Sequence, residues 1–365
     1  MESVCHTDSV NKVEEKVMKK HIGYIVGVAL LAMGCDSTVL EYPVDGGVDP
    51  TRVHVNLTFE VDPTLEPYTK VGMSDRTDEV TVHDVRWIIE IFRDNVDGEL
   101  VERRVLSCDP DSEGKHTIDA AFDLHAAKYR VVAWMDYVED GSTEDKYYQI
   151  ESLASINILD AENYIGDEDH KDTYVGNQEL DLTAYRDRWD QSVDRTILLE
   201  RPMAKIEFIT TDVDKLFEEW TTQNARRDGV LKSLPEGYDL TNISSWQVQI
   251  EYAGYLPSSF NAYTNKPNDA QMGISFTTTL KPLSSQEAHL GSDFIFVNGE
   301  ESAVNVNLRV LDEQGTVINE VQGIEVPIAR GKLTSIRDEF LTQSYAPGIG
   351  IDPEFDGNIE VVIPD

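Results

Sequence analysis

The residues able to do chemistry in this chain are few, and they are not spaced as a catalytic site. The sequence holds three cysteines and eight histidines, and neither residue type occurs at metal-ligand spacing. It contains no GxSxG serine motif, HExxH zinc motif, phosphate-binding glycine loop or paired CxxC. We therefore expect neither enzyme activity nor a cofactor.

Acidic residues come closest to a metal motif. The segment at 109–114, "DPDSEG", begins like a calcium-binding loop. Such a loop needs a bidentate glutamate at its twelfth position, which is Ala120 here. We interpret the segment as a solvated turn. A second cluster, "DEDH" at 167–170, could hold a cation loosely, but an acidic chain produces such clusters by chance. No metal site is expected.

Cys35 differs from the other cysteines because it follows a segment typical of export. Lys19 and Lys20 precede thirteen uncharged, mostly apolar residues at 22–34. That is too short to span a bilayer, which takes about 20 apolar residues, but it suits the core of a secretory signal. The last four positions, "AMGC", resemble a lipobox, in which the cysteine sulfur is lipidated. We predict that Cys35 begins the mature protein; the alternative is a buried strand ending in a free cysteine.

The segments around Cys35 fit this interpretation. Residues 1–34 would then be a spurious polar leader plus a signal peptide, with Met18 as the true start. Residues 35–51 contain two prolines and a Gly-Gly pair and are predicted to be a lipidated tether. Only Cys108 would remain as a free thiol, so no disulfide can form within the mature chain. The mature protein is then expected to be a soluble body attached to a membrane by lipid.

The charge balance limits the partners. There are 68 acidic residues against 31 basic ones, giving a formal net charge of −37. Nucleic acid is disfavoured as a partner, because binding phosphates needs a basic face. A hydrophobic content of 40% argues against disorder.

Elements with a two-residue hydrophobic period dominate the rest of the chain. In "RVHVNLTFEV" the apolar residues alternate with polar ones, which predicts a strand with one face in a core; they are Val53, Val55, Leu57, Phe59 and Val61. Many such strands with few helices indicate an all-β protein built of antiparallel sandwiches. The polar stretch 160–195 interrupts this pattern and is interpreted as a long excursion, with a short helix spacing Leu182, Tyr185 and Trp189.

This break predicts two tandem sandwiches, at 52–199 and 200–344, followed by a tail strand within 345–365. The second sandwich is expected to hold a short helical insertion, because residues 213–220 carry apolar side chains at helical spacing after Asp212.

Four stretches together resemble one known family, the Bacteroidales fimbrillin-like lipoproteins, and within it the minor fimbrial subunits and anchors. They are the lipobox through Cys35, "YRVVAWMDY" at 129–137, "LERPMAKIEF" at 199–208, and "VNVNLRVLDEQG" followed by "IEVPIARGKLTSIRDEFLT" at 304–342. The resemblance implies two transthyretin-like sandwiches, export to the outer membrane, and a role in fimbriae and cell adhesion. Its implied partners are other fimbrial subunits, membrane lipid, and a host or bacterial surface ligand.

The same resemblance implies assembly by strand exchange. In that family a protease specific for arginine or lysine removes the first strand of a stalk subunit, and the C-terminal strand of the next subunit fills the gap. Here the strand to be displaced would be 53–61, and a cut at Lys70 or Arg76 would free it, whereas a cut at Arg52 would remove only the tether. The donor would be 358–363, with Ile359, Val361 and Ile363 alternating. Two alternatives stay open: the basic residues are ordinary exposed charges, and the tail is an edge strand of its own sandwich.

A glycan-binding surface lipoprotein is the competing function. It needs exposed aromatic side chains on the same sandwiches. Trp87 and Trp246 are in phase with apolar strand residues and are expected in the core. Trp134 points away from the apolar face of its strand, so we consider it the best candidate for an exposed aromatic.

Overall fold

The structure is a computed structural model. It describes residues 6–7, 52–62, 83–110, 116–186, 188, 191–219, 242–343 and 359–362. Cys35, Met18, Lys70, Arg76 and Ile363 lie outside the described residues, as do Trp189 and Trp220. In the described part, no helix is long and apolar enough to cross a membrane.

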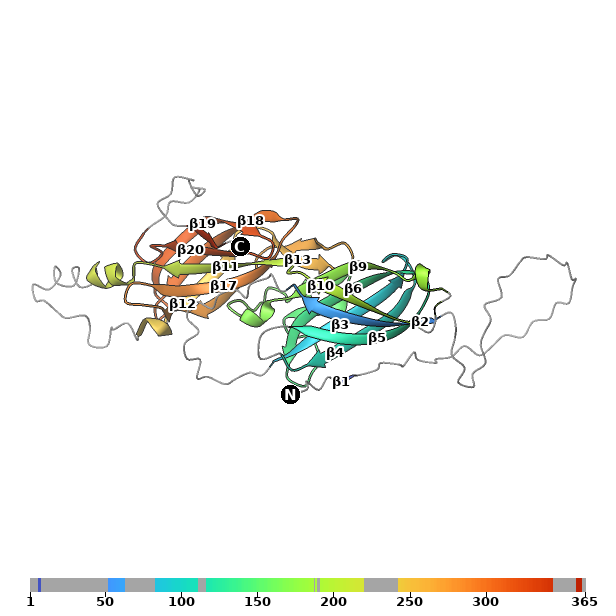
Figure 1. Ribbon diagram of the computed structural model, residues 1–365. Coiled ribbons are helices and arrows are strands. Elements are labelled where there is room, and N and C mark those ends of the chain that lie inside the picture. The colour runs from blue at the N-terminus through green and yellow to red at the C-terminus, as the bar shows by residue number, and fades with distance from the viewer. Residues whose placement is uncertain are drawn as a thin grey trace, which may run out of the picture.

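The first half of the chain forms two facing sheets (Figure 1). One has five strands in the order β1-β4-β3-β6-β9, which are His6–Thr7, Leu100–Cys108, His83–Arg93, Lys128–Glu139 and Tyr174–Asp181. The other has three in the order β10-β2-β5, which are Ser192–Leu199, Arg52–Val61 and Thr117–His125. Alternate apolar residues from both sheets meet in one core cluster. The all-β sandwich prediction is confirmed here.

The second half repeats the plan with different strands. A five-stranded sheet runs β16-β17-β11-β20-β21, which are Lys281–Pro282, Ala288–Phe296, Met203–Thr210, Leu333–Asp338 and Ile359–Val362. A four-stranded sheet runs β15-β12-β18-β19, which are Ser275–Thr279, Gln247–Tyr252, Glu301–Leu311 and Val317–Ala329. A single 3-10 turn, η3 (Asn242–Ser245), precedes β12. Residues 213–219 are helical, as the spacing predicts.

Two strand pairs are parallel, which differs from the purely antiparallel expectation. β10 pairs parallel with β2, and β11 pairs parallel with β20. A parallel pair needs a long crossover, and in both cases more than a hundred residues separate the partners. Period-two patterning cannot distinguish the two directions, because alternation is the same in both.

A fifth sheet, of four strands, joins the two halves. Its order is β14-β13-β8-β7, with Lys266–Gln271 and Leu256–Asn261 from the second half and Ser155–Ile158 and Tyr148–Ser152 from the first. Figure 1 places β13 between the two lobes. The predicted domains 52–199 and 200–344 follow the order of the two halves along the chain. Residues 148–158 of the first domain, however, belong to a sheet that continues into the second.

The stretch 160–195 is not the polar excursion that its composition suggests. It contains β9, which pairs with β6 over eight residues, and the start of β10. The expected helix is reduced to a 3-10 turn, η2 (Thr183–Tyr185), and a second 3-10 turn is η1 (Asp169–Lys171). Its many charged residues predicted a solvated loop, but several of these side chains form ion pairs inside the protein, as described below.

Candidate functional site

The strand predicted to be displaced, β2, supplies one wall of the first core. Val53, Val55, Leu57 and Phe59 are at most 1% exposed, and Val61 is partly buried at the end of the strand. Each packs into the cluster shared with the facing five-stranded sheet. The side-chain phase predicted from the sequence is therefore confirmed.

β2 is the middle strand of its sheet. Residues 54–61 pair with all of β10, and residues 52–60 pair with all of β5. Outward-facing side chains form cross-strand hydrogen bonds: His54 with Asp123 at 3.0 Å, Asn56 with Asp194 at 2.8 Å, and Thr58 with Asp119 at 2.6 Å. Removing β2 would leave two unpaired strand edges and an open apolar groove between them.

The tail strand β21 lies on the edge of the second half. It pairs antiparallel with β20, Ile359 opposite Ile336 and Val362 opposite Leu333. The sequence left open an intramolecular edge strand or a donor to another subunit, and the structure pairs it within the chain. Its use as a donor stays a prediction.

Of the predicted cleavage residues, only Arg52 lies in the described part of the chain. Arg52 is exposed at the first position of β2, opposite His125. Lys70 and Arg76 follow β2 in the undescribed segment 63–82. Cleavage at any of them stays a prediction.

Trp134 is buried, so its assignment as an exposed aromatic is wrong. It lies in β6 with 0% exposure, and its ring centroid is 5.9 Å from that of Tyr148 and 6.1 Å from that of Phe260. β6 is covered on both faces: Val131 and Ala133 face the first core, while Val132 and Trp134 belong to the cluster that continues into the second half. A second apolar layer on its polar-looking face explains the error. Trp87 and Trp246 are buried as expected.

The "DEDH" cluster proves to be part of an ion-pair network between the two halves. Asp167 contacts Lys281 and accepts a hydrogen bond from the Ser292 N–H, and Asp169 accepts one from Lys205 at 2.6 Å. Glu168 accepts from the His170 N–H and lies 2.7 Å from its ring Nδ1. Since these carboxylates have protein partners, they do not form a loose cation site.

The centre of this network is buried. Lys171, 2% exposed, donates to Asp293 Oδ1 at 2.5 Å and to Tyr164 at 3.0 Å. Asp293 also accepts from the hydroxyls of Tyr164 and Tyr252 and from the Phe294 N–H. Burial lowers the pKa of Lys171, and Asp293 opposes that shift.

The next residue along, Asp172, continues the network. It accepts from Arg201 Nε at 2.9 Å and from the Tyr174 hydroxyl at 2.7 Å. Sequence reasoning missed all of these pairs. One signal in the sequence could have indicated them. Acidic and basic residues lie close together at 167–172, and Tyr164 and Tyr174 flank them; large aromatic side chains are not needed in a solvated loop.

The exposed part of the described surface offers little aromatic area. Tyr255, 72% exposed, is the only large aromatic side chain among the described residues with such exposure. A polar cavity of about 190 Å³ lies over β12, β15 and β18, where Gln249, Thr277, Asn307 and Arg309 contribute to its lining.

A model of one protein family matches residues 50–364, nearly the whole body of the chain; it is described as a family of unknown function (DUF6562). The chain belongs to this family. No curated protein matches the sequence.

Three of the solved structures similar to this chain come from Porphyromonas, Parabacteroides and Bacteroides. The fimbrial anchor protein Mfa2 from Porphyromonas gingivalis is 13% identical with a TM-score of 0.38, and the match covers 78% of this chain and 90% of that one. A fimbrial assembly protein from Parabacteroides distasonis is 11% identical, TM-score 0.35, covering 78% and 90%. A candidate polysaccharide-binding protein from Bacteroides thetaiotaomicron is 12% identical, TM-score 0.43, covering 74% and 80%.

Proposed function

We propose that this chain is a cell-surface fimbrial subunit, an anchor or accessory subunit attached to the outer membrane by lipid on Cys35. The signal-like segment ending at Cys35 supports export and lipid attachment. The fimbrial role rests on the sequence resemblance and on the placement of β2. The similar solved structures add no weight, because their TM-scores lie below 0.5.

The observation that supports edge-strand completion is that β2 is one replaceable strand between two strands from distant parts of the chain. A strand from another subunit could form the same two ladders and fill the same four buried positions. Backbone hydrogen bonds would then supply affinity, and the alternate pockets specificity. In an uncut anchor, β2 and the lipid stay in place, and residues 358–363, with Ile359, Val361 and Ile363 alternating, are the donor. Cleavage at Lys70 or Arg76 would free β2 together with the lipidated segment, as in a stalk subunit.

The first experiment is intact-mass and N-terminal analysis of the protein from native outer membranes. A lipidated N-terminus at Cys35 on an uncut chain is the result expected for an anchor or accessory subunit. A free N-terminus at Val71 or Thr77 would instead identify a stalk subunit that loses β2. An unlipidated chain that still contains residues 1–34 would contradict the proposal.

A truncation tests the tail separately. Removing residues 345–365 should abolish assembly with other fimbrial subunits, while far-ultraviolet circular dichroism keeps the strand signal of the body. The matched control replaces Ser302 and Asn305 on exposed positions of β18 with alanine, which should not affect assembly. Assembly of the truncated chain at the full-length level would exclude the tail as donor.

Glycan binding is a second candidate function, favoured by the polar cavity over β12, β15 and β18. Its amide, hydroxyl and guanidinium groups could hydrogen-bond sugar hydroxyls. A glycan array probed with residues 52–365 tests this. Binding that is lost on Gln249→Ala would support it, and the absence of any bound glycan would leave the fimbrial proposal alone.

A further inference from the structure

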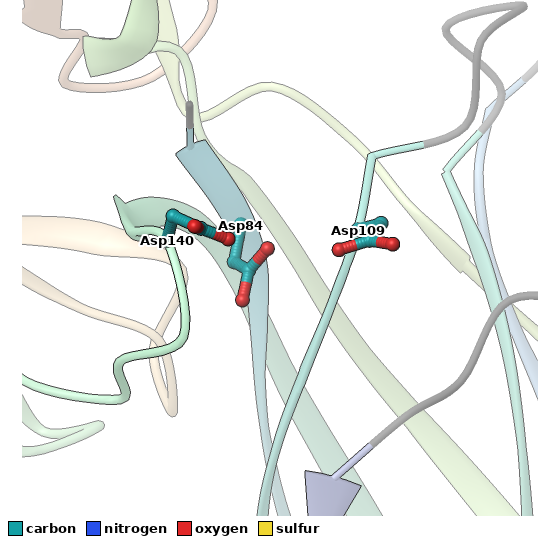
Figure 2. A group of neighbouring side chains, drawn as sticks. All are labelled: Asp84, Asp109 and Asp140. Atoms are coloured by element: carbon teal, nitrogen blue, oxygen red, sulfur yellow. The ribbon is translucent and has the colours of Figure 1, made fainter. Parts of the chain in front are cut away.

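Three aspartates from separate strands meet at one end of the five-stranded sheet of the first half. Asp84 is at the start of β3, Asp109 follows β4, and Asp140 follows β6. These strands are neighbours in the order β4-β3-β6, and Val85 lies opposite Cys108. One carboxylate oxygen from each aspartate lies within 4.8 Å of the others (Figure 2).

Asp84 is the buried member of this group, and one of its carboxylate oxygens has no partner. It is only 6% exposed. Its Oδ2 accepts hydrogen bonds from Ser107 Oγ at 3.1 Å and from the Gly141 N–H at 3.0 Å. Its Oδ1 is buried and has no hydrogen-bond partner. Figure 2 shows the Asp84 carboxyl between those of Asp140 and Asp109. A buried carboxylate oxygen without a partner is costly and rare in folded proteins.

The rest of the molecule treats buried acids differently. Three buried carboxylates have a basic partner, Asp136 with Arg86, Asp172 with Arg201, and Asp293 with Lys171. Asp212, 0% exposed, instead accepts hydrogen bonds from the Leu341 and Thr342 N–H groups. Within the described residues, none of the three clustered aspartates forms an ion pair. Three like charges at this separation repel one another, and the described residues supply no positive charge to offset them.

We propose that Asp84, Asp109 and Asp140 bind one calcium ion at this end of the sheet. Carboxylate oxygens are the ligands of a hard cation, and calcium takes them at about 2.3–2.6 Å. Two oxygens on opposite sides of one ion are then about 4.6–5.2 Å apart, so oxygens within 4.8 Å can reach the same ion. Ligands from the ends of three separate strands suit the irregular coordination of calcium better than the near-ideal octahedron of magnesium.

The ion would join the ends of β3, β4 and β6. Asp109 and Asp140 are exposed, so solvent can reach the site and water can complete the coordination shell. The bound ion would satisfy the Asp84 oxygen and remove the repulsion among the three charges. This inference does not depend on the proposed function.

Calcium titration of the EDTA-stripped, dialysed protein tests the site. Isothermal calorimetry should find one ion per chain with a Kd of about 10⁻⁴–10⁻³ M, and calcium should raise the Tm. Asp140→Asn, at an exposed position, should weaken binding by about tenfold or more, because affinity follows the number of charged ligands. The matched control is Asp97→Asn, in the exposed turn at the opposite end of β3, which should bind as the wild type does.

Asp84→Asn separates a metal site from a merely structural role. It should abolish the calcium response and, without calcium, should raise the Tm because a buried charge is removed. The proposal is overturned if the wild type shows no calcium-dependent heat or Tm shift at 10 Kd of the expected range, about 10 mM. It is also overturned if Asp84→Asn and Asp140→Asn respond like the wild type, which would mean diffuse binding to an acidic surface. An equal Tm rise with magnesium would exclude calcium as the specific ligand.

Discussion

Single residues determine how the two halves of this protein adhere. Lys171 comes from the stretch before β9 and Asp293 from β17, yet they form a buried pair at 2.5 Å. Asp293 keeps three donors besides Lys171, whereas Lys171 keeps only the Tyr164 hydroxyl among its side-chain contacts. Losing Asp293 should therefore destabilise the fold more than losing Lys171, and the free energy of unfolding of each variant measures this.

Asp293→Asn should destabilise the fold more than Lys171→Met does. The first change leaves a buried ammonium without an anion, which costs about 3–5 kcal/mol. The second leaves a carboxylate with three hydrogen-bond donors and should cost less. Urea unfolding measures both. The matched control is Glu320→Gln, which breaks the exposed 3.0 Å pair with Arg309 and should cost at most about 1 kcal/mol. Equal costs for all three variants would contradict the assigned role of the buried pair.

Glu168 should make stability depend on pH in the acid range. Burial raises the pKa of its carboxyl, but hydrogen bonds from the His170 ring and N–H outweigh burial and lower the pKa to about 2. The His83 ring stacks on His170 with centroids 3.7 Å apart and adds positive charge when protonated. A lowered folded-state pKa stabilises the fold above the unfolded value, near 4.5, and this contribution is lost as the pH falls toward 2.

The difference between wild type and Glu168→Gln isolates that contribution. The wild type should be about 1–3 kcal/mol more stable at pH 6, and the gap should close between pH 4.5 and 2. Denaturant unfolding at a series of pH values gives the gap. Glu325→Gln, on an exposed position of β19, is the control and should show no such gap. A gap that is constant with pH would contradict the assignment to this carboxyl.

Strand positions could be predicted where one face of an element is buried and the other is wet. β2 and β19 alternate as their sequences predict, with Ile324, Val326 and Ile328 inward. Two strands were predicted less well. The outward face of β6 was expected to be exposed but is covered by a second apolar layer, and β9 lies in a stretch whose charged residues predicted a loop. Burial of Trp134 depends on residues more than a hundred positions away, such as Phe260, and local alternation does not contain that information.

The candidate sites show the same limit. The apolar phase of β2 follows from its own residues, but its position between β10 and β5 depends on long-range pairing. Asp84, Asp109 and Asp140 could not be grouped from the sequence, because each lies next to a different strand. Asp212 was expected only to begin the helix; its carboxyl also accepts hydrogen bonds from the Leu341 and Thr342 N–H groups, which fixes the chain after β20.

Within β2, the inward and outward positions should differ strongly in their contribution to stability. Phe59→Ala opens a cavity in the first core and should cost about 3–5 kcal/mol. Thr58→Ala, the adjacent outward position, removes one exposed hydrogen bond to Asp119 and should cost about 1 kcal/mol or less. Chemical denaturation of the two variants checks this. Similar costs at both positions would mean that β2 is not seated in the core as described.

At the scale of the whole molecule, the five-stranded sheet of the first half is shared by two cores. One cluster lies between it and the β10-β2-β5 sheet, and the other continues from its opposite face through β7, β8 and β13 into the second half. The junction is therefore apolar and continuous, with the ion pairs of Lys171, Asp172 and Asp169 beside it. Interfaces within a chain that are large and apolar do not act as hinges.

Such a junction should make the two halves unfold together. Calorimetry of residues 52–365 should give one transition, with the calorimetric enthalpy equal to the van't Hoff enthalpy. Trp134→Ala removes the ring that contacts Tyr148, Phe260 and Phe296 across the junction, so it should cost about 3–5 kcal/mol and separate the transition into two. Trp87→Ala, inside the first core alone, is the matched control: it should cost as much but leave the junction intact, so the chain should still melt in one transition at a lower Tm. If the wild type already melts in two steps, the junction does not couple the halves.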